Sequence, residues 1–183
     1  MAVENWPSNS GGTINPKVAG ALGTLGARRQ VDYYDPITGA LTGEQREEIF
    51  LYNATGAATI IGDAYALAIN STSTAQVLQA IVLAALALPR EVVIATSVIA
   101  AAGYGWFALS GPVNATLHGA IAANAHVKVT TGTSTRALVT DTTGTATSVG
   151  INGNVAAPGG TPSVPTAAVP NKIYLRGSHT VIA

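Results

Sequence analysis

The chain has 183 residues, of which 48% are hydrophobic and only 10% are charged, against roughly 25% in an ordinary soluble protein. Nine basic and nine acidic residues give zero net charge, which argues against a nucleic-acid-binding surface that neutralises phosphates. The chain has no cysteine, so disulfides and cysteine-ligated zinc sites are excluded.

The shortage of charge indicates how the surface is used. A free monomer usually stays apart from its neighbours through surface charge, and this chain would present Thr, Ser, Asn, Gly and Ala instead. Such a surface is typical of a protein whose exposed area is largely covered by partners. Charge is also concentrated near the N-terminus, since residues 1–50 carry most of it.

Residues 1–45 predict an extended N-terminal arm. Glycine and proline recur there at a density that argues against long helices or strands. Apolar side chains lie between them, whereas a disordered tail is poor in such residues. We therefore expect the arm to become ordered by lying on another surface, and its deletion over residues 1–40 to leave the rest folded. The expected anchors are Trp6, Ile14, Val18, Leu22, Leu25, Tyr33 and Tyr34.

No targeting or membrane-spanning segment is predicted. The first residues lack the basic start and apolar run of a signal peptide. The longest apolar run, at 80–88, is far shorter than the ~20 residues that span a bilayer. The expectation is a soluble product made in the cytoplasm that does not insert into a membrane.

Residues 46–183 predict a β domain. A strand is expected at 47–52 with Ile49 and Leu51 on one face, followed by a turn at 59–63 and an extended segment at 64–69. Residues 76–88 are ambiguous, because Ala and Leu favour a helix while a doubly buried strand fits equally well. The β-branched residues at 92–98 favour the strand.

The stretch GYGWFALSGPVNATLHG, at 103–119, contains one of the two tryptophans. We interpret Gly103 and Gly105 as positions where the backbone turns tightly, and Trp106 and Phe107 as anchors for the strand that follows. That strand is expected to end in a turn at Ser110. A Trp on such a strand is most often buried in a core or a subunit interface, and a sugar-stacking platform with Tyr104 is the alternative.

The C-terminal part predicts short strands. Alternation at 126–130, which puts Val127 and Val129 inward, and a return strand at 136–140 indicate a hairpin. Residues 145–151 and 172–176 are further strands, the latter with Ile173 and Leu175 inward. Residues 153–170 form a loop too rich in Pro and Gly for a regular element. The fold class predicted is mainly β, a compact β-barrel or β-sandwich with an extended N-terminal arm.

No catalytic or metal site is predicted. The three histidines do not have metal-ligand spacing, and neither a GxSxG nucleophile motif nor a phosphate-binding loop is present. Past residue 50 the acidic residues are few, and turn capping explains the aspartates. The residues considered were His118, His126, His179, Asp63, Glu91 and Asp141. We expect no enzyme activity and no cofactor, and we attribute the N-x-[ST] triplets at Asn53, Asn70 and Asn114 to chance.

Three segments resemble a known family. PREVVIATSVIAAAGYGWFALSGPVNATLHG, AHVKVTTGTSTRALVTDTTGTATSVGI and NKIYLRGS are similar in texture and order to tailed-bacteriophage capsid decoration (cement) proteins. The resemblance covers roughly residues 47–183.

The resemblance implies a structural virion protein on the outer face of the capsid. It implies that the chain cements neighbouring capsomers. The implied partners are the major capsid protein and further copies of the chain, which would form a homotrimer. The arm residues and Trp106 are then expected to make the capsid or subunit contacts. A tail or other minor virion protein is one alternative, and a carbohydrate-binding β module using Tyr104, Trp106 and Asp63 or Asp141 is another.

Overall fold

The computed structural model is an all-β protein. It contains ten strands, and no helix occurs in the residues that it describes, so the predicted fold class is confirmed. The structure describes residues 25–35, 39–70, 77–82, 91–119, 121–129, 137–142, 148–153 and 171–176.

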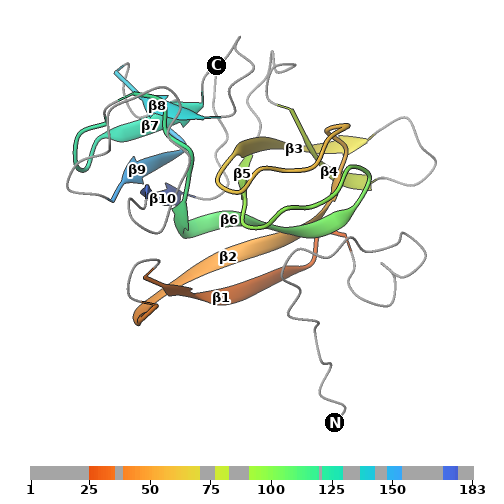
Figure 1. Ribbon diagram of the computed structural model, residues 1–183, viewed down its shortest axis with the longest axis horizontal. Helices are drawn as coiled ribbons and strands as arrows, with labels where there is room; N and C mark the ends of the chain where they lie inside the picture. The colour runs from red at the N-terminus through yellow and green to blue at the C-terminus, as the bar shows by residue number, and fades with distance from the viewer. Residues whose placement is uncertain are drawn as a thin grey trace.

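All ten strands belong to one mixed sheet (Figure 1). Its order is β1-β2-β4-β3-β5-β6-β10-β9-β7-β8, and β2 also pairs with β6. The strands are β1 (Arg28–Tyr34), β2 (Leu41–Asn53), β3 (Ala64–Asn70), β4 (Val77–Ile81), β5 (Val92–Ala95), β6 (Tyr104–Asn114), β7 (His126–Val129), β8 (Leu138–Thr140), β9 (Gly150–Asn152) and β10 (Lys172–Arg176).

The additional β2–β6 pairing closes a ring of five strands, β2-β4-β3-β5-β6. The closed ring is a barrel, which leaves no free strand edge within it. Alternate residues of its strands point inward, among them Ile49 and Leu51 of β2, as the sequence predicted. Tyr65 and Phe107 meet edge to face inside, with ring centroids 5.9 Å apart.

A second ring shares β6 with the first. Beyond Ser110, β6 pairs with β10, and β9, β7 and β8 follow in order. The chain after β6 returns to β8, where Leu117 bridges Leu138. The Leu138 amide donates to the Thr116 carbonyl and the His118 amide donates to the Leu138 carbonyl, each at 2.8 Å. These bonds close the second ring.

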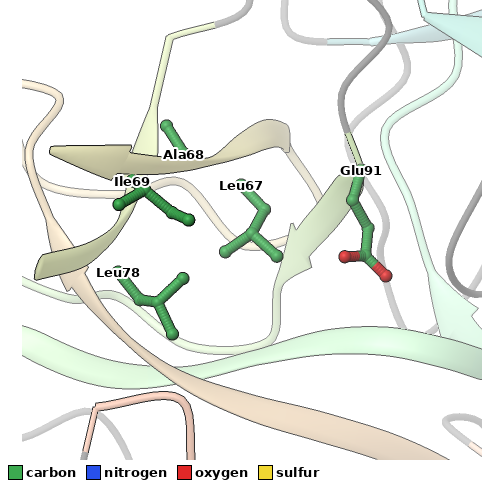
Figure 2. A pocket seen from close by; sticks show the side chains of 5 residues that line it. All are labelled: Leu67, Ala68, Ile69, Leu78 and Glu91. Carbon is green, nitrogen blue, oxygen red and sulfur yellow. The ribbon is translucent and has the colours of Figure 1, made fainter. Parts of the chain in front are cut away.

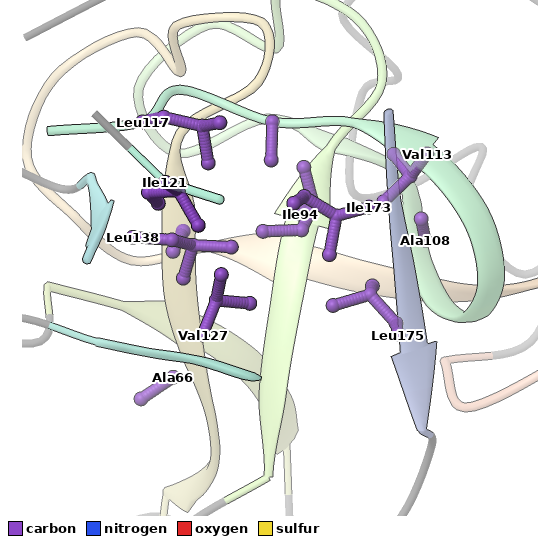
Figure 3. Close-up of a cluster of buried hydrophobic side chains, with 12 residues drawn as sticks. Ala66, Ile94, Ala108, Val113, Leu117, Ile121, Val127, Leu138, Ile173 and Leu175 are labelled. Carbon is purple, nitrogen blue, oxygen red and sulfur yellow. The ribbon is translucent and has the colours of Figure 1, made fainter. Parts of the chain in front are cut away.

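Each ring has its own core. Successive side chains of the shared strands point in turn into one core and into the other. Phe107 and Leu109 of β6 fill the first ring, whereas Ala108 faces the second core. Figure 3 shows Ile94 of β5 in that second core beside Ile173. Each of these strands is therefore buried on both faces, which accounts for their continuously apolar sequences.

β6 passes from one ring to the other at Gly111, where we had expected a turn after Ser110. The strand continues through Gly111 and Pro112 to Asn114. Gly111 has a φ of +85°, and a Cβ there would lie 2.6 Å from the Gln45 carbonyl oxygen. The glycine thus bends the strand without ending it, and the expected turn is wrong. Gly105 likewise lies within β6 and not in a turn. A glycine is needed there because the Ile99 side chain occupies the space that a Cβ would fill.

Part of the predicted arm is a strand of the sheet. β1 pairs antiparallel with β2 from Arg28–Ile49 to Tyr34–Leu41. The predicted boundary between residues 45 and 46 falls inside β2, so it does not separate an arm from the sheet. Glycines misled this prediction, because Gly26 and Gly39 lie at positive φ on either side of β1.

The ambiguous segment 76–88 contains β4, so the strand interpretation is confirmed over Val77–Ile81, while residues 83–90 lie outside the described part. Most of the Pro/Gly-rich segment 153–170 also lies outside it. A deletion of residues 1–40 would remove β1 and the buried Tyr33, contrary to the expectation that the remainder stays folded.

Replacing Gly111 with Ala tests whether β6 needs a glycine where it passes from one ring to the other. Gly56 also has positive φ, but no atom lies within 4 Å of a Cβ placed there, so Gly56→Ala is the matched control. We expect Gly56→Ala to cost about 1 kcal/mol of unfolding free energy and Gly111→Ala at least ~3 kcal/mol, because backbone atoms must move. Denaturant unfolding measures both free-energy losses. Equal losses would contradict the close approach of the β2 backbone to Gly111.

Candidate functional site

One end of the first ring is an apolar surface without charge. Two loops cover it, residues 54–63 between β2 and β3 and residues 96–103 between β5 and β6. Asp63 is the one charged residue in them, and it is buried. Ile60, Ile61 and Val98 are each about half exposed, at 50%, 46% and 49%. We call this the barrel-end surface, formed by the exposed residues Ala57, Ala58, Ile60, Ile61, Val98, Ala101 and Ala102.

The buried side chain of Asn53 links the two loops. It is fully buried, and its side-chain amide nitrogen lies 2.8–3.0 Å from the carbonyl oxygens of Ala57, Ile99 and Ala100. Its side-chain oxygen accepts a hydrogen bond from the Thr55 hydroxyl at 2.7 Å. One buried amide thus fixes both loops to the end of β2.

Thr59 provides a second link between the loops. Its buried hydroxyl donates to the Ser97 carbonyl at 2.9 Å and accepts from the Ile99 amide at 2.7 Å. The Gly62 amide also donates to the Ala95 carbonyl at 2.9 Å. The barrel-end surface is therefore held in one conformation, which lowers the entropy that would be lost on binding.

Sequence reasoning missed this surface. The triplet Asn53-Ala54-Thr55 was attributed to chance, and its residues hydrogen-bond each other within the fold. The signal that could have found the site is the scarcity of charge in both segments, in which Asp63 is the one charged residue.

Trp106 does not form part of an exposed contact surface. Only 6% of it is exposed, with the Phe50 ring 5.1 Å away and the Arg29 guanidinium 4.2 Å above the indole. Leu25 and Ala27 pack against the same pair of rings. The chain itself covers Trp106, which leaves little of this side chain for the expected capsid or subunit contact.

The predicted arm anchors are distributed between buried, exposed and undescribed positions. Leu25 packs beside Trp106, and Tyr33 is 3% exposed and donates a hydrogen bond to Asn114 Oδ1 at 2.9 Å. Tyr34 is 55% exposed, opposite the equally exposed Leu41. The anchors that lie outside the described residues are Trp6, Ile14, Val18 and Leu22.

The acidic and histidine candidates are not assembled into one site. Asp63 accepts a hydrogen bond from the Thr116 hydroxyl at 3.0 Å, and Asp141 pairs with Lys128 at 3.6 Å. His126 Nδ1 lies 3.1 Å from Ser148 Oγ. Among the described residues, no three His, Asp or Glu side chains converge on one point, and no helix long and apolar enough to cross a membrane is found.

No protein-family model, curated protein or solved structure matches this chain. The resemblance to capsid decoration proteins therefore stays a prediction.

A polar cluster fastens the β1–β2 hairpin to β10. Glu44 accepts hydrogen bonds from the Lys172 ammonium and the Tyr174 hydroxyl. Burial alone would raise the pKa of Glu44, but these two bonds outweigh it and hold the pKa below its usual value. Burial would lower the pKa of Lys172, and its contacts with Glu44 and Tyr174 raise it above the usual value.

Glu44→Gln should therefore reduce stability in a pH-dependent manner. Because the folded-state pKa of Glu44 is lowered, its contribution is present above pH 4.5 and is lost as pH falls below that value. We expect a loss of about 0.5–1 kcal/mol at pH 7, since the pair is partly exposed, and little loss near pH 2.5. Urea unfolding across this pH range measures it. A loss independent of pH would contradict a stabilising role for the Glu44 carboxylate. Lys172→Met should reduce the free energy of unfolding less in the Glu44→Gln background than alone, because the two residues interact.

Proposed function

We propose that this chain is a structural virion protein that binds the outer capsid shell and cements neighbouring capsomers. Its proposed partners are the major capsid protein and copies of itself in a homotrimer. In this role the protein resists separation of capsomers, because separating them would expose an interface that it keeps buried. Specific interfaces bury about 1,200–2,000 Å², enough for tight binding.

The observation that carries this proposal is the barrel-end surface. Half-exposed Ile60, Ile61 and Val98 lie on loops that expose no charged side chain, and Asn53 and Thr59 fix those loops from inside. Contiguous exposed apolar residues mark interaction sites in monomeric proteins. A rigid, uncharged surface suits a contact with another folded protein, and such a contact would depend weakly on salt.

The N-terminal segment is proposed as a second contact. Residues 1–24 precede the described part of the chain, and Tyr34 and Leu41 form a further exposed apolar pair on the hairpin. A segment that orders on docking loses conformational entropy and gains contact area. The apolar residues of this segment are its proposed anchors.

The burial of Trp106 and Asp63 argues against the carbohydrate-binding alternative. Trp106 is covered by Arg29, and Asp63 is buried and hydrogen-bonded to Thr116. A stacking sugar needs an exposed aromatic face. A tail or minor virion role shares the low charge and the β fold, and copy number per particle separates it from a shell role.

Adding a charge to the barrel-end surface should weaken capsid binding. Ile61→Glu would bury an unpaired carboxylate in the contact, and we expect binding about 30-fold weaker, roughly 2 kcal/mol. Co-sedimentation of the purified protein with shells that lack it measures the affinity.

The matched control is Gln30→Glu, which adds the same charge at an exposed position of β1. It should bind like the wild type, and circular dichroism should show that both variants are folded. Equal binding by Ile61→Glu and the wild type would exclude the barrel-end surface from the contact.

A further inference from the structure

Strand β1 forms an edge of the sheet. Among the described strands it pairs with β2 alone, so the backbone groups on its other side have no strand partner (Figure 1). β1 is seven residues long and stays extended to Tyr34, because the register shift beside it places the extra residues in β2. A free edge of this length is a template on which another strand can pair.

Alternate residues of β1 turn their backbone groups toward this free edge. The Phe50 amide donates to the Ala27 carbonyl at 2.9 Å, so Ala27 faces β2. In an antiparallel pair, residues that face the partner strand alternate with residues that face away from it. The amide and carbonyl groups of Arg28, Gln30 and Asp32 therefore point to the free edge, and the side chains of all three are exposed.

The charges on this edge are complementary to a second copy of the same strand. Proline and lysine often block edge strands, and β1 contains neither. When two β1 strands run antiparallel with Gln30 opposite Gln30, Arg28 of each copy faces Asp32 of the other. Centring the pair on Arg28 or on Asp32 would instead place like charges opposite each other, which is unfavourable. Glu47 beside Arg28 and Gln45 beside Asp32 hold these two side chains on the exposed face of the hairpin.

We propose that β1 pairs antiparallel with β1 of a second copy of this chain, about a two-fold axis at Gln30. Each pair of facing residues exchanges two backbone hydrogen bonds, and each Arg28 lies beside Asp32 of the second copy. The same register carries Tyr34, which is 55% exposed, toward Gly26 of the second copy and adds apolar contact. The sheets of the two copies then continue across the contact as one.

This contact is separate from the contacts of the proposed virion role, and it does not depend on that role. A two-fold contact joins copies in pairs and cannot close a ring of three, so in a homotrimer it would link one trimer to the next. β1 pairs with β2 before the barrel-end loops begin. A charge introduced at Gln30 therefore acts on the contact between copies and not on the barrel-end surface.

Disulfide cross-linking of the full-length protein tests the pairing, because the chain has no cysteine of its own. In the proposed register Gln30→Cys lies opposite itself, with the two Cα atoms about 5.5 Å apart, which is within the range of a disulfide. Tyr34→Cys is the matched control, since it is exposed on the same strand but its two copies lie about 26 Å apart. With a mild oxidant added, we expect Gln30→Cys to form covalent dimers about tenfold faster than Tyr34→Cys.

The role of charge is tested in the Gln30→Cys background. Adding Asp32→Arg makes both facing charge pairs repulsive, so we expect cross-linking to be about tenfold slower. Adding Arg28→Asp instead should slow it by a similar factor. Mixing the two variants restores opposite charges in both pairs, and the mixed dimer, identified by its mass, should form at the rate of Gln30→Cys alone. Circular dichroism should show that each variant is folded.

Equal rates for Gln30→Cys and Tyr34→Cys would overturn the proposal, because random collision would then explain both. A failure of Gln30→Cys to form covalent dimers would also overturn it, since the edge would then be covered by another segment or kept for a different protein. A mixed dimer that forms no faster than the dimers of the separate charge variants would exclude the register centred on Gln30. All of these experiments use the purified chain without capsid shells, so their outcome is independent of the virion role.

Discussion

Strand β6 belongs to two closed rings at once, and the other elements take their places from its path. Its first half pairs with β2 and β5, and its second half pairs with β10. The change of partner occurs at Gly111, where the backbone of β2 approaches too closely for a side chain. Because Phe107 and Ala108 face different cores, loss of register in this strand would expose apolar side chains of both.

The two ends of the first ring differ in chemistry. The barrel-end loops satisfy their backbone groups through Asn53 and Thr59, so their surface needs no charged side chain to hold its shape. The opposite end contains the cavity that Figure 2 shows, where Glu91 joins apolar side chains and Leu78 of the lining lies against Gly26. A rigid apolar surface at one end and the chain entering at Gly26 near the other give the proposed cement protein two separate means of attachment.

Local patterns predicted the strands whose two faces differ in polarity. Alternation placed Ile173 and Leu175 inward in β10, and Val127 and Val129 inward in β7. Ile173, Leu175 and Val127 are buried, and Val129 is partly buried. The β1 strand was missed because glycines on either side resembled breakers. The burial of Trp106 under Arg29 and the hydrogen bonds of Asn53 depend on residues distant in sequence, which no local pattern encodes. The scarcity of charge in the barrel-end loops was visible in the sequence, but only the fold brings the two loops together.

Quantitative mass spectrometry of purified virions gives the copy number of this chain relative to the major capsid protein, and so decides whether the chain belongs to the shell. We expect a ratio near one, or another simple fraction fixed by the symmetry of the shell. A handful of copies per particle would indicate a tail or minor component instead. Absence from the particles would contradict the virion role.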